Sequence, residues 1–295
     1  MKLEQNIFSN SDSSEDNPGN TVAYMDIARG MSALNGRSIT QTRRSKGKYK
    51  PLGYLIRIRV LNGDVLVETA NAGYPTRNAV VLAGHARDEM LKSAGVSRGN
   101  LETYQKELRL RMTCSHTEAN TIMPGATKTG AEGARTDVGY TASYGNGLTY
   151  DYTSIVFDKP SSPGTDVSQQ LVLLGGKPSG PVGDETCAPV IYNWHAWRHS
   201  FTPSAADDDI ADNVFSYAMQ QSSTADKIID IVEDEADEKP YNLDDFYDRT
   251  IQTVVGTTVG NPISGVICAP LGLVKITTGT SGATWETEVV GVVEL

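Results

Sequence analysis

Cysteine and histidine are the residues with which this sequence could bind a metal or form a covalent intermediate, and both are scarce. The chain holds three cysteines, Cys114, Cys187 and Cys268, and four histidines. The cysteines are widely spaced and odd in number, so they define no disulfide framework, and we expect assembly in a reducing compartment. Cys114 and His116 stand too close together, with no second ligand pair, to form a structural zinc site. We therefore expect no metal ion and no cofactor.

The other histidines occur in patterns that packing explains. His85 and Glu89 are one helical turn apart, but the second histidine of a zinc-protease helix is missing. His195 and His199 fall in an aromatic stretch that we interpret as a strand, in which the two rings would share one face. We expect this face to pack in an aromatic core or a subunit contact, and a metal pair is the alternative.

Motifs for covalent catalysis and nucleotide binding are also missing from the sequence. No Gly-x-Ser-x-Gly elbow is present, and the Gly-Lys-Pro of residues 176–178 lacks the Ser or Thr that follows lysine in a phosphate-binding loop. We expect the protein not to be an enzyme and assign no catalytic residue. A hydrolase without a recognisable motif is the alternative, and it would need a histidine, a nucleophile and a carboxylate that meet in a cleft.

One segment does carry a chemically specific pattern, a run of cations with no acid nearby. Residues 30–63 contain eight basic residues and no Asp or Glu. Closely spaced positive charges bind nucleic-acid phosphates without fixed geometry, because binding releases counterions. We expect the cations of residues 43–50 to lie on an extended, flexible segment with no helical or strand period. A solvated linker and a contact with an acidic protein surface are the alternatives. The candidate nucleic-acid-binding residues are Arg37, Arg43, Arg44, Lys46, Lys48 and Lys50.

The acidic residues are concentrated elsewhere. The whole chain has 26 basic and 36 acidic residues, a formal net charge of -10. Residues 202–248 hold fourteen of the acids and only two bases, and their apolar spacing predicts helices. We therefore expect two surfaces of opposite charge, and the acidic segment of a neighbouring copy is one surface that the basic segment could contact.

Local patterns predict the elements around the basic segment. Residues 1–20 are polar and should be disordered when alone in water. Residues 54–60 alternate in polarity, and Asn62-Gly63 then predicts a tight turn, so that residues 52–69 would form a hairpin. Arg57 and Arg59 would continue the basic surface onto this sheet.

Two helices are predicted next, and mainly strands after them. The helices run over residues 78–93, ended by Gly95, and from Asn100 to about Leu110. The spacing of the strand candidates favours a β-sandwich or barrel with helical insertions at about 76–112 and 204–248. Residues 1–50 would form an N-terminal arm, and residues 51–295 the main domain. The strand candidates are residues 148–157, 169–174, 189–197, 251–255, 263–277 and 285–295.

Three segments carry a resemblance to a known family. They are the basic Arg-Arg-Ser-Lys-Gly-Lys of residues 43–48 before a strand, the helical segment of residues 77–96, and residues 268–274, which resemble a penultimate strand. These segments are similar to parts of the jelly-roll capsid proteins of small icosahedral viruses with circular single-stranded DNA. The acidic residues 202–248 and the negative total charge depart from the usual basic coat.

The resemblance implies a structural role. A mainly β, single jelly-roll β-sandwich would assemble in many copies into an icosahedral shell around a genome, with a double jelly roll as the alternative fold. The protein would belong to the virion after assembly inside the host cell. That site of assembly agrees with a sequence that shows neither a membrane-spanning apolar run nor a secretory signal. A surface adhesin or carbohydrate-binding β-sandwich is the alternative, in which Trp194, Trp197 and Trp285 would stack on sugars.

Overall fold

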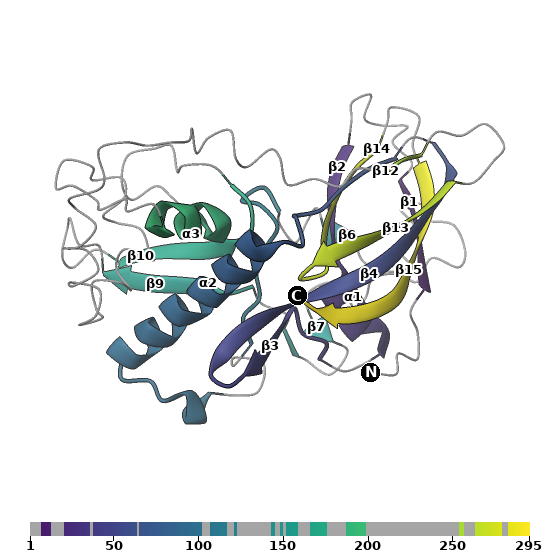
Figure 1. Cartoon of the computed structure of the whole chain (residues 1–295). Coiled ribbons are helices and arrows are strands. Elements are labelled where there is room, and N and C mark those ends of the chain that lie inside the picture. The colour runs from purple at the N-terminus through teal and green to yellow at the C-terminus, as the bar shows by residue number, and fades with distance from the viewer. Residues whose placement is uncertain are drawn as a thin grey trace, which may run out of the picture.

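The structure of the chain is a computed structural model, shown in Figure 1. It describes residues 7–12, 21–35, 38–63, 65–101, 107–116, 121–122, 143–144, 148–149, 152–158, 166–175, 187–198, 254–256, 263–278 and 283–295. The predicted acidic helices of residues 204–248 lie outside these ranges, as does Arg37. Two lobes are visible, a β-sandwich on the right and a mixed lobe around the longest helix on the left (Figure 1).

Two sheets form the sandwich. The first has the order β1 (Ile7–Asp12), β15 (Ala283–Glu294), β4 (Lys48–Asn62) and β13 (Ile263–Pro270), and β3 (Thr42–Ser45) pairs with the beginning of β4. The second has the order β12 (Val254–Gly256), β5 (Val65–Glu68), β14 (Leu273–Thr278), β2 (Thr21–Asp26) and β6 (Thr121–Ile122). The fold is therefore mainly β and consistent with a β-sandwich, as the spacing of the strand candidates predicts.

The strand pairs are nested along the chain. β1 pairs with β15, β2 with β14, β4 with β13 and β5 with β12, and all four pairs are antiparallel. Successive strands of this set change sheet each time, except at the step from β5 to β12, which stay side by side. The first half of the sandwich is thus matched strand by strand with the second half in reverse order.

The core of the sandwich follows from the alternation along β4. Ile56, Ile58 and Val60 point inward and are buried, and they form one apolar cluster with Trp285 and with residues of the opposite sheet such as Ile276. Burial of large apolar side chains at every second position is what holds two sheets face to face.

The outer face of β4 carries the two arginines predicted to extend the basic surface. Arg57 and Arg59 are exposed, and each lies opposite a glutamate of β15. The Arg57 Nη1 to Glu288 Oε2 distance is 2.8 Å, and the Arg59 Nη1 to Glu286 Oε2 distance is 3.6 Å. These ion pairs neutralise the arginines, so the basic surface does not continue onto this sheet.

The hairpin predicted for residues 52–69 is wrong. Gly63 does have the positive φ of a turn, +81°, but β4 and β5 belong to different sheets and do not pair. β4 instead pairs along its length with β13 and β15, and β5 with β12 and β14. The local turn signal is correct, while long-range pairing decides the partners of the flanking strands.

The second lobe packs two helices on a small sheet. α2 (Tyr74–Ser93) and α3 (Val190–Arg198) lie with the sheet β9 (Ser154–Asp158), β10 (Asp166–Val172) and β11 (Cys187–Pro189). Buried side chains such as Ala83, Leu171 and Trp194 share its core. Short elements complete the described set: α1 (Ile27–Asn35), a 3₁₀ turn (Arg98–Asn100), β7 (Ser143–Tyr144) and β8 (Leu148–Thr149).

The helix predicted over residues 78–93 is confirmed, and it begins four residues earlier. Pro75 stands in its first turn, where the missing backbone N–H costs nothing, and Gly95 follows with φ +70°. The strand predicted over residues 189–197 is wrong, because the chain turns into α3 after Pro189. The second predicted helix does not reach Leu110, since residues 108–110 are buried and not helical, and residues 102–106 lie outside the described ranges.

The first 50 residues do not form a separate arm in the described ranges. β1 is an edge strand on β15, β2 lies within the second sheet, and α1 follows β2 directly. Asp26 caps α1, because its Oδ1 accepts a hydrogen bond of 2.9 Å from the backbone N–H of Arg29. Pairing with C-terminal strands therefore orders segments that are too polar to fold alone.

The cysteines define no disulfide framework in the sequence, but the structure contains one disulfide. Cys114 and Cys187 form a disulfide whose Cα atoms are 5.7 Å apart, and it joins segments separated by 73 residues. Cys268, on β13, is a free thiol. The odd cysteine count does not indicate which two cysteines pair, because the third, Cys268, lies in the other lobe. Among the described residues, no helix is long and apolar enough to cross a membrane.

Candidate nucleic-acid interface

Five of the six candidate cations lie on a β-hairpin. β3 and the beginning of β4 pair antiparallel, with Arg43 opposite Lys50 and Ser45 opposite Lys48. The connection has two residues, Lys46 with φ 49° and Gly47 with φ 81°. Positive φ at both positions is the two-residue turn that matches the twist of antiparallel strands. The expectation of a flexible segment without a strand period is therefore wrong. The two-residue turn and the long strand β4 order residues 43–50 as a hairpin.

The two faces of the hairpin differ in character. Arg44 and Tyr49 form one cross-strand pair, which faces α2. Arg43 and Lys50 form the next pair, and successive pairs in a ladder point to opposite faces. Arg43 and Lys48 are exposed, as is Lys46 in the turn. The hairpin thus has a docking face and a cationic face.

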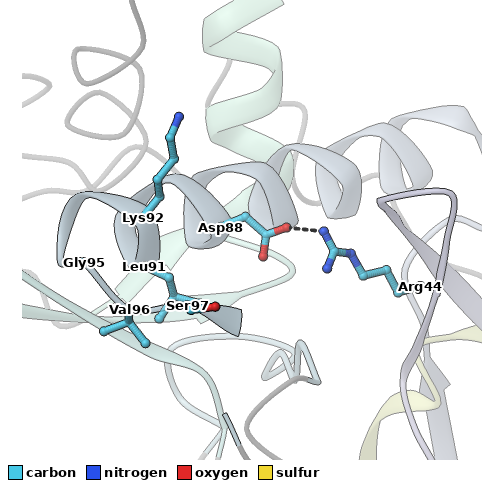
Figure 2. A pocket seen from close by; sticks show the side chains of 7 residues that line it. All are labelled: Arg44, Asp88, Leu91, Lys92, Gly95, Val96 and Ser97. Atoms are coloured by element: carbon cyan, nitrogen blue, oxygen red, sulfur yellow. Dashed lines mark hydrogen bonds and ion pairs between the residues drawn. The ribbon is translucent and has the colours of Figure 1, made fainter. Parts of the chain in front are cut away.

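The docking face is held on α2 by one aromatic ring and one ion pair. Tyr49 is buried and sits against Gly84, where an added Cβ would lie 2.1 Å from the Tyr49 Cδ2 atom. The Arg44 Nη2 to Asp88 Oδ2 distance is 2.8 Å, as Figure 2 shows. The Tyr49 hydroxyl also donates to Asp88 Oδ1 at 3.3 Å and accepts from Arg87 at 3.1 Å. A side-chain-free position on the helix therefore lets the hairpin approach closely.

A pocket of about 450 Å³ opens beside this contact. Arg44 and Asp88 border it on one side, and Leu91, Val96 and Ser97 on the other (Figure 2). Arg44 and Asp88 point toward each other, whereas Lys92 points away from Val96 and Ser97. The pocket is thus bordered by a neutral ion pair and by largely apolar side chains.

The base of the hairpin contacts the end of the chain. Lys50 forms an ion pair with Glu294 of β15, and the Leu295 backbone N–H donates to Pro51 O at 3.0 Å. Arg43 lines a second hollow, of about 420 Å³, together with Tyr54 and residues 289–294. The C-terminal strand therefore fixes the base of the hairpin and neutralises one of its cations.

The structure divides the predicted site residues into groups. Arg44 and Lys50 are paired with carboxylates, and Arg44 is also exposed. Arg43, Lys46 and Lys48 are exposed with no carboxylate partner seen among the described residues. The residues that hold the hairpin, Gly84, Asp88 and Glu294, are not predicted from the sequence. No local signal distinguishes them, because each is more than 30 positions from its hairpin partner.

A buried polar network begins at Gln41, directly before β3, and joins the two lobes. Gln41 donates to Asp26 Oδ2 at 3.0 Å and accepts from the Leu110 backbone N–H at 2.7 Å, and the Tyr152 hydroxyl donates to Asp26 at 3.2 Å. Burial raises the pKa of Asp26. These bonds tie β2 to residues 108–110 of the second lobe. The Asp26 carboxyl group accepts two of them.

His116 belongs to the same region and is stacked between aromatic rings. Its ring lies 4.6 Å from that of Tyr24, centroid to centroid, and edge-on to that of Tyr152 at 5.4 Å. Nδ1 accepts from the Met112 backbone N–H at 3.1 Å, so Nε2 carries the proton and donates to Thr121 Oγ1 at 2.9 Å. Burial, with smaller contributions from Arg111 and Arg29, lowers the pKa of His116 to about 3. This histidine is a neutral packing residue, with neither nitrogen free for catalysis.

No group of three or more metal-ligating side chains occurs in the part of the chain that the structure describes. His85 is exposed on α2, and His195 is on α3. His199 lies outside the described residues. No protein-family model, curated protein or solved structure matches this chain.

Proposed function

We propose that this protein is the coat subunit of a virus, a jelly-roll protein that assembles in many copies into an icosahedral shell around nucleic acid. It would reside in the virion after assembly inside the host cell. In this role the chain acts through the fit between copies and performs no chemical reaction.

The observation that carries the proposal is the nested order of strand pairs. A jelly roll is a long antiparallel ribbon of four strand pairs, folded over so that its strands alternate between two sheets. The pairs β1–β15, β2–β14, β4–β13 and β5–β12 match that ribbon from its open end to its closed end. Sheet orders of β1-β15-β4-β13 and β12-β5-β14-β2 also match the folded ribbon. The described residues contain one such sandwich, which favours a single over a double jelly roll.

The position of the second lobe fits a shell subunit. The lobe is inserted between β5 and β12, the one step at which the chain stays in the same sheet. An insertion at a strand connection leaves the sandwich pairing intact and adds surface outside it. A stable contact between copies generally buries more than about 1,000 Å², so such additional surface suits symmetric assembly.

The cationic hairpin supplies a contact for the enclosed genome. Its exposed lysines and arginine would face the interior of the shell, where nucleic-acid phosphates balance their charge. The overall formal charge of -10 does not oppose this arrangement, because the excess of acids over bases lies in residues 202–248, with fourteen acids and two bases.

The carbohydrate-binding alternative finds little support in the aromatic side chains. Trp285 is fully buried between the sheets and Trp194 is 5% exposed in the second lobe. Neither ring can stack on a sugar. The side chain of Trp197 lies outside the described part of the structure.

Electron microscopy of the purified full-length protein tests the proposal. We expect negatively stained samples to contain closed particles of uniform diameter, and sedimentation to show one large species. Varying pH and ionic strength over several preparations guards against missing a narrow assembly window. A protein that stays monomeric across these conditions, at concentrations of tens of micromolar, would contradict the proposal. A glycan array with specific binding by the monomer would then support the adhesin.

A further inference from the structure

We infer that the β3–β4 hairpin binds nucleic acid through phosphate groups alone, with Arg43, Lys46 and Lys48 as the binding residues and Arg44 and Lys50 as positioning residues. This inference rests on the nucleic-acid contact in the proposed function. It gives different roles to five cations that look equivalent in the sequence.

Two of the five cations are already neutralised by carboxylates from other elements. Arg44 binds Asp88 of α2, and Lys50 binds Glu294 of β15. A phosphate that approached either site would meet a net charge near zero, so few counterions would be released. The two ion pairs instead fix the hairpin at its docking face and at its base.

The other three cations are free to meet a polyanion. Arg43, Lys46 and Lys48 are exposed, and no carboxylate partner for them is seen among the described residues. A two-residue turn keeps Lys46 and Lys48 close together at the tip. Glu294 lines the hollow beside Arg43, but its carboxylate is bound to Lys50. The exposed charge of the hairpin is therefore about three positive charges on a preformed support.

The hairpin offers no exposed aromatic ring on which bases could stack. Its only aromatic residue, Tyr49, is 2% exposed, and the Tyr49 hydroxyl is engaged with Asp88 and Arg87. Base stacking on an exposed aromatic ring is the usual source of sequence-tolerant affinity beyond charge in single-strand binders. Without such a ring, the affinity should come from the cations and depend steeply on salt.

Fluorescence anisotropy with a labelled 20-nucleotide oligo(dT) tests this division. The full-length protein is measured at concentrations where sedimentation shows unassembled subunits, from 50 to 300 mM salt. We expect the triple variant R43Q/K46Q/K48Q to lower the slope of log K against log salt by about 2, since each lost contact to a single strand removes about 0.7. Affinity near 100 mM salt should fall roughly 100-fold by the same relation.

A matched control removes the same charge from cations that are ion-paired elsewhere. R57Q/R59Q/K275Q disrupts the pairs with Glu288, Glu286 and Glu68 on the two sheets. Its slope should equal that of the wild type. An equal loss in both triple variants would show that total charge alone matters, and this would overturn the inference.

The salt slope tests the positioning roles of Arg44 and Lys50, because a change in fold stability alone would not alter it in the expected way. E294Q should release Lys50 and steepen the slope by up to about 0.7, a gain of binding from a single substitution. R44Q should weaken binding without changing the slope, and R44K should restore it by keeping a cation beside Asp88. A flatter slope in E294Q, or a slope change of a full contact in R44Q, would overturn the assigned roles.

Sequence independence is checked with oligo(dA), a mixed-sequence strand and a 20-base-pair duplex. Affinities for the single strands should agree within about threefold, and the duplex should also bind, with a slope of about 0.9 per contact. A preference of more than tenfold for one base sequence would overturn phosphate-only binding. If particles form normally while the triple variant keeps its slope, the hairpin inference fails and the capsid proposal stands. If instead the triple variant loses slope as expected but no particles form under any condition, the hairpin inference stands and the capsid proposal fails.

Discussion

At the scale of single residues, the position of the hairpin depends on the missing side chain of Gly84. G84A would place a Cβ atom 2.1 Å from the Tyr49 ring, far inside van der Waals contact. Alanine by itself favours a helix by up to about 1 kcal/mol, but overpacking costs about 1–3 kcal/mol. We expect a net loss of stability in urea unfolding, together with weaker oligonucleotide binding.

Two controls isolate this contact. G99A adds a Cβ whose nearest neighbour is 3.5 Å away, so its unfolding free energy should hardly change. In G84A/Y49A the ring is gone, so the double variant should cost less than the sum of the two single variants. Additive losses would contradict the close contact between hairpin and helix.

His116 gives a prediction about pH. Its folded pKa of about 3 lies below the ordinary value of 6.5, so the unfolded chain binds this proton more readily. The contribution of His116 to stability is complete above about pH 6.5 and decreases as the pH falls toward 3, by up to about 1.4 kcal/mol per pH unit. Asp26, with its raised pKa, acts in the opposite direction, because its contribution is lost as the pH rises above 3.8.

Asp26 and the other carboxyl groups contribute equally to the wild type and to a His116 variant. The difference between their unfolding free energies therefore isolates the contribution of His116. The free energy of unfolding of H116Q should fall less steeply than that of the wild type between pH 6.5 and 4.5. H85Q, at an exposed position on α2, is the control that removes a histidine without removing a buried contact. Parallel curves for H116Q and the wild type would mean that His116 is not held neutral.

At the scale of elements, the sequence predicts what local patterns determine. The helix over residues 78–93 and the inward residues Ile56, Ile58 and Val60 of β4 follow from periodicity, and the structure has both. Gly47 of the hairpin turn is a turn signal, but residues 43–50 show no alternation of apolar and polar side chains, so local pattern alone does not predict strands on either side of it. The aromatic run at 194–199 fits either a strand or a helix by period, and contact of α3 with α2 decides for the helix.

The disulfide links two elements of the second lobe. Cys114 follows the mostly buried segment of residues 108–112, and Cys187 begins β11. A cross-link that closes a loop of this length stabilises a protein by about 2–4 kcal/mol, mainly by restricting the unfolded chain. We expect C114S/C187S, or reduction with dithiothreitol, to lower the unfolding free energy by that amount.

C268S is the matched control for this prediction, because Cys268 is a free thiol on another element. Its stability should stay near that of the wild type and should still fall on reduction, whereas C114S/C187S should not respond to reductant. Alkylation and mass spectrometry before and after reduction check the pairing directly. Three alkylated cysteines in the unreduced protein would contradict it.

At the scale of the whole molecule, the nested strand order could not be predicted from the sequence. β1 and β15 pair although they lie at opposite ends of the chain, and β5 and β12 pair across the whole second lobe. Alternation identifies a strand and its buried face, but it says nothing of which distant strand lies beside it. The same limit applies to the interface, where Arg44 meets Asp88 and Lys50 meets Glu294 from distant elements.

The proposed particle has two kinds of contact that salt should separate. Phosphate contacts of the hairpin weaken steeply with ionic strength, because counterions compete for both partners. Apolar contacts between copies are insensitive to screening. Raising sodium chloride from about 0.1 to 0.5 M shortens the Debye length from about 10 Å to less than half of that, so we expect nucleic acid to be released while particles persist.

The ratio of absorbance at 260 and 280 nm, measured on particles after sedimentation, follows the release. R43Q/K46Q/K48Q particles should contain less nucleic acid already at low salt, and R57Q/R59Q/K275Q particles as much as the wild type. Particles that dissociate at the same salt concentration that frees their nucleic acid would show that the genome, and not the contact between copies, holds the shell together.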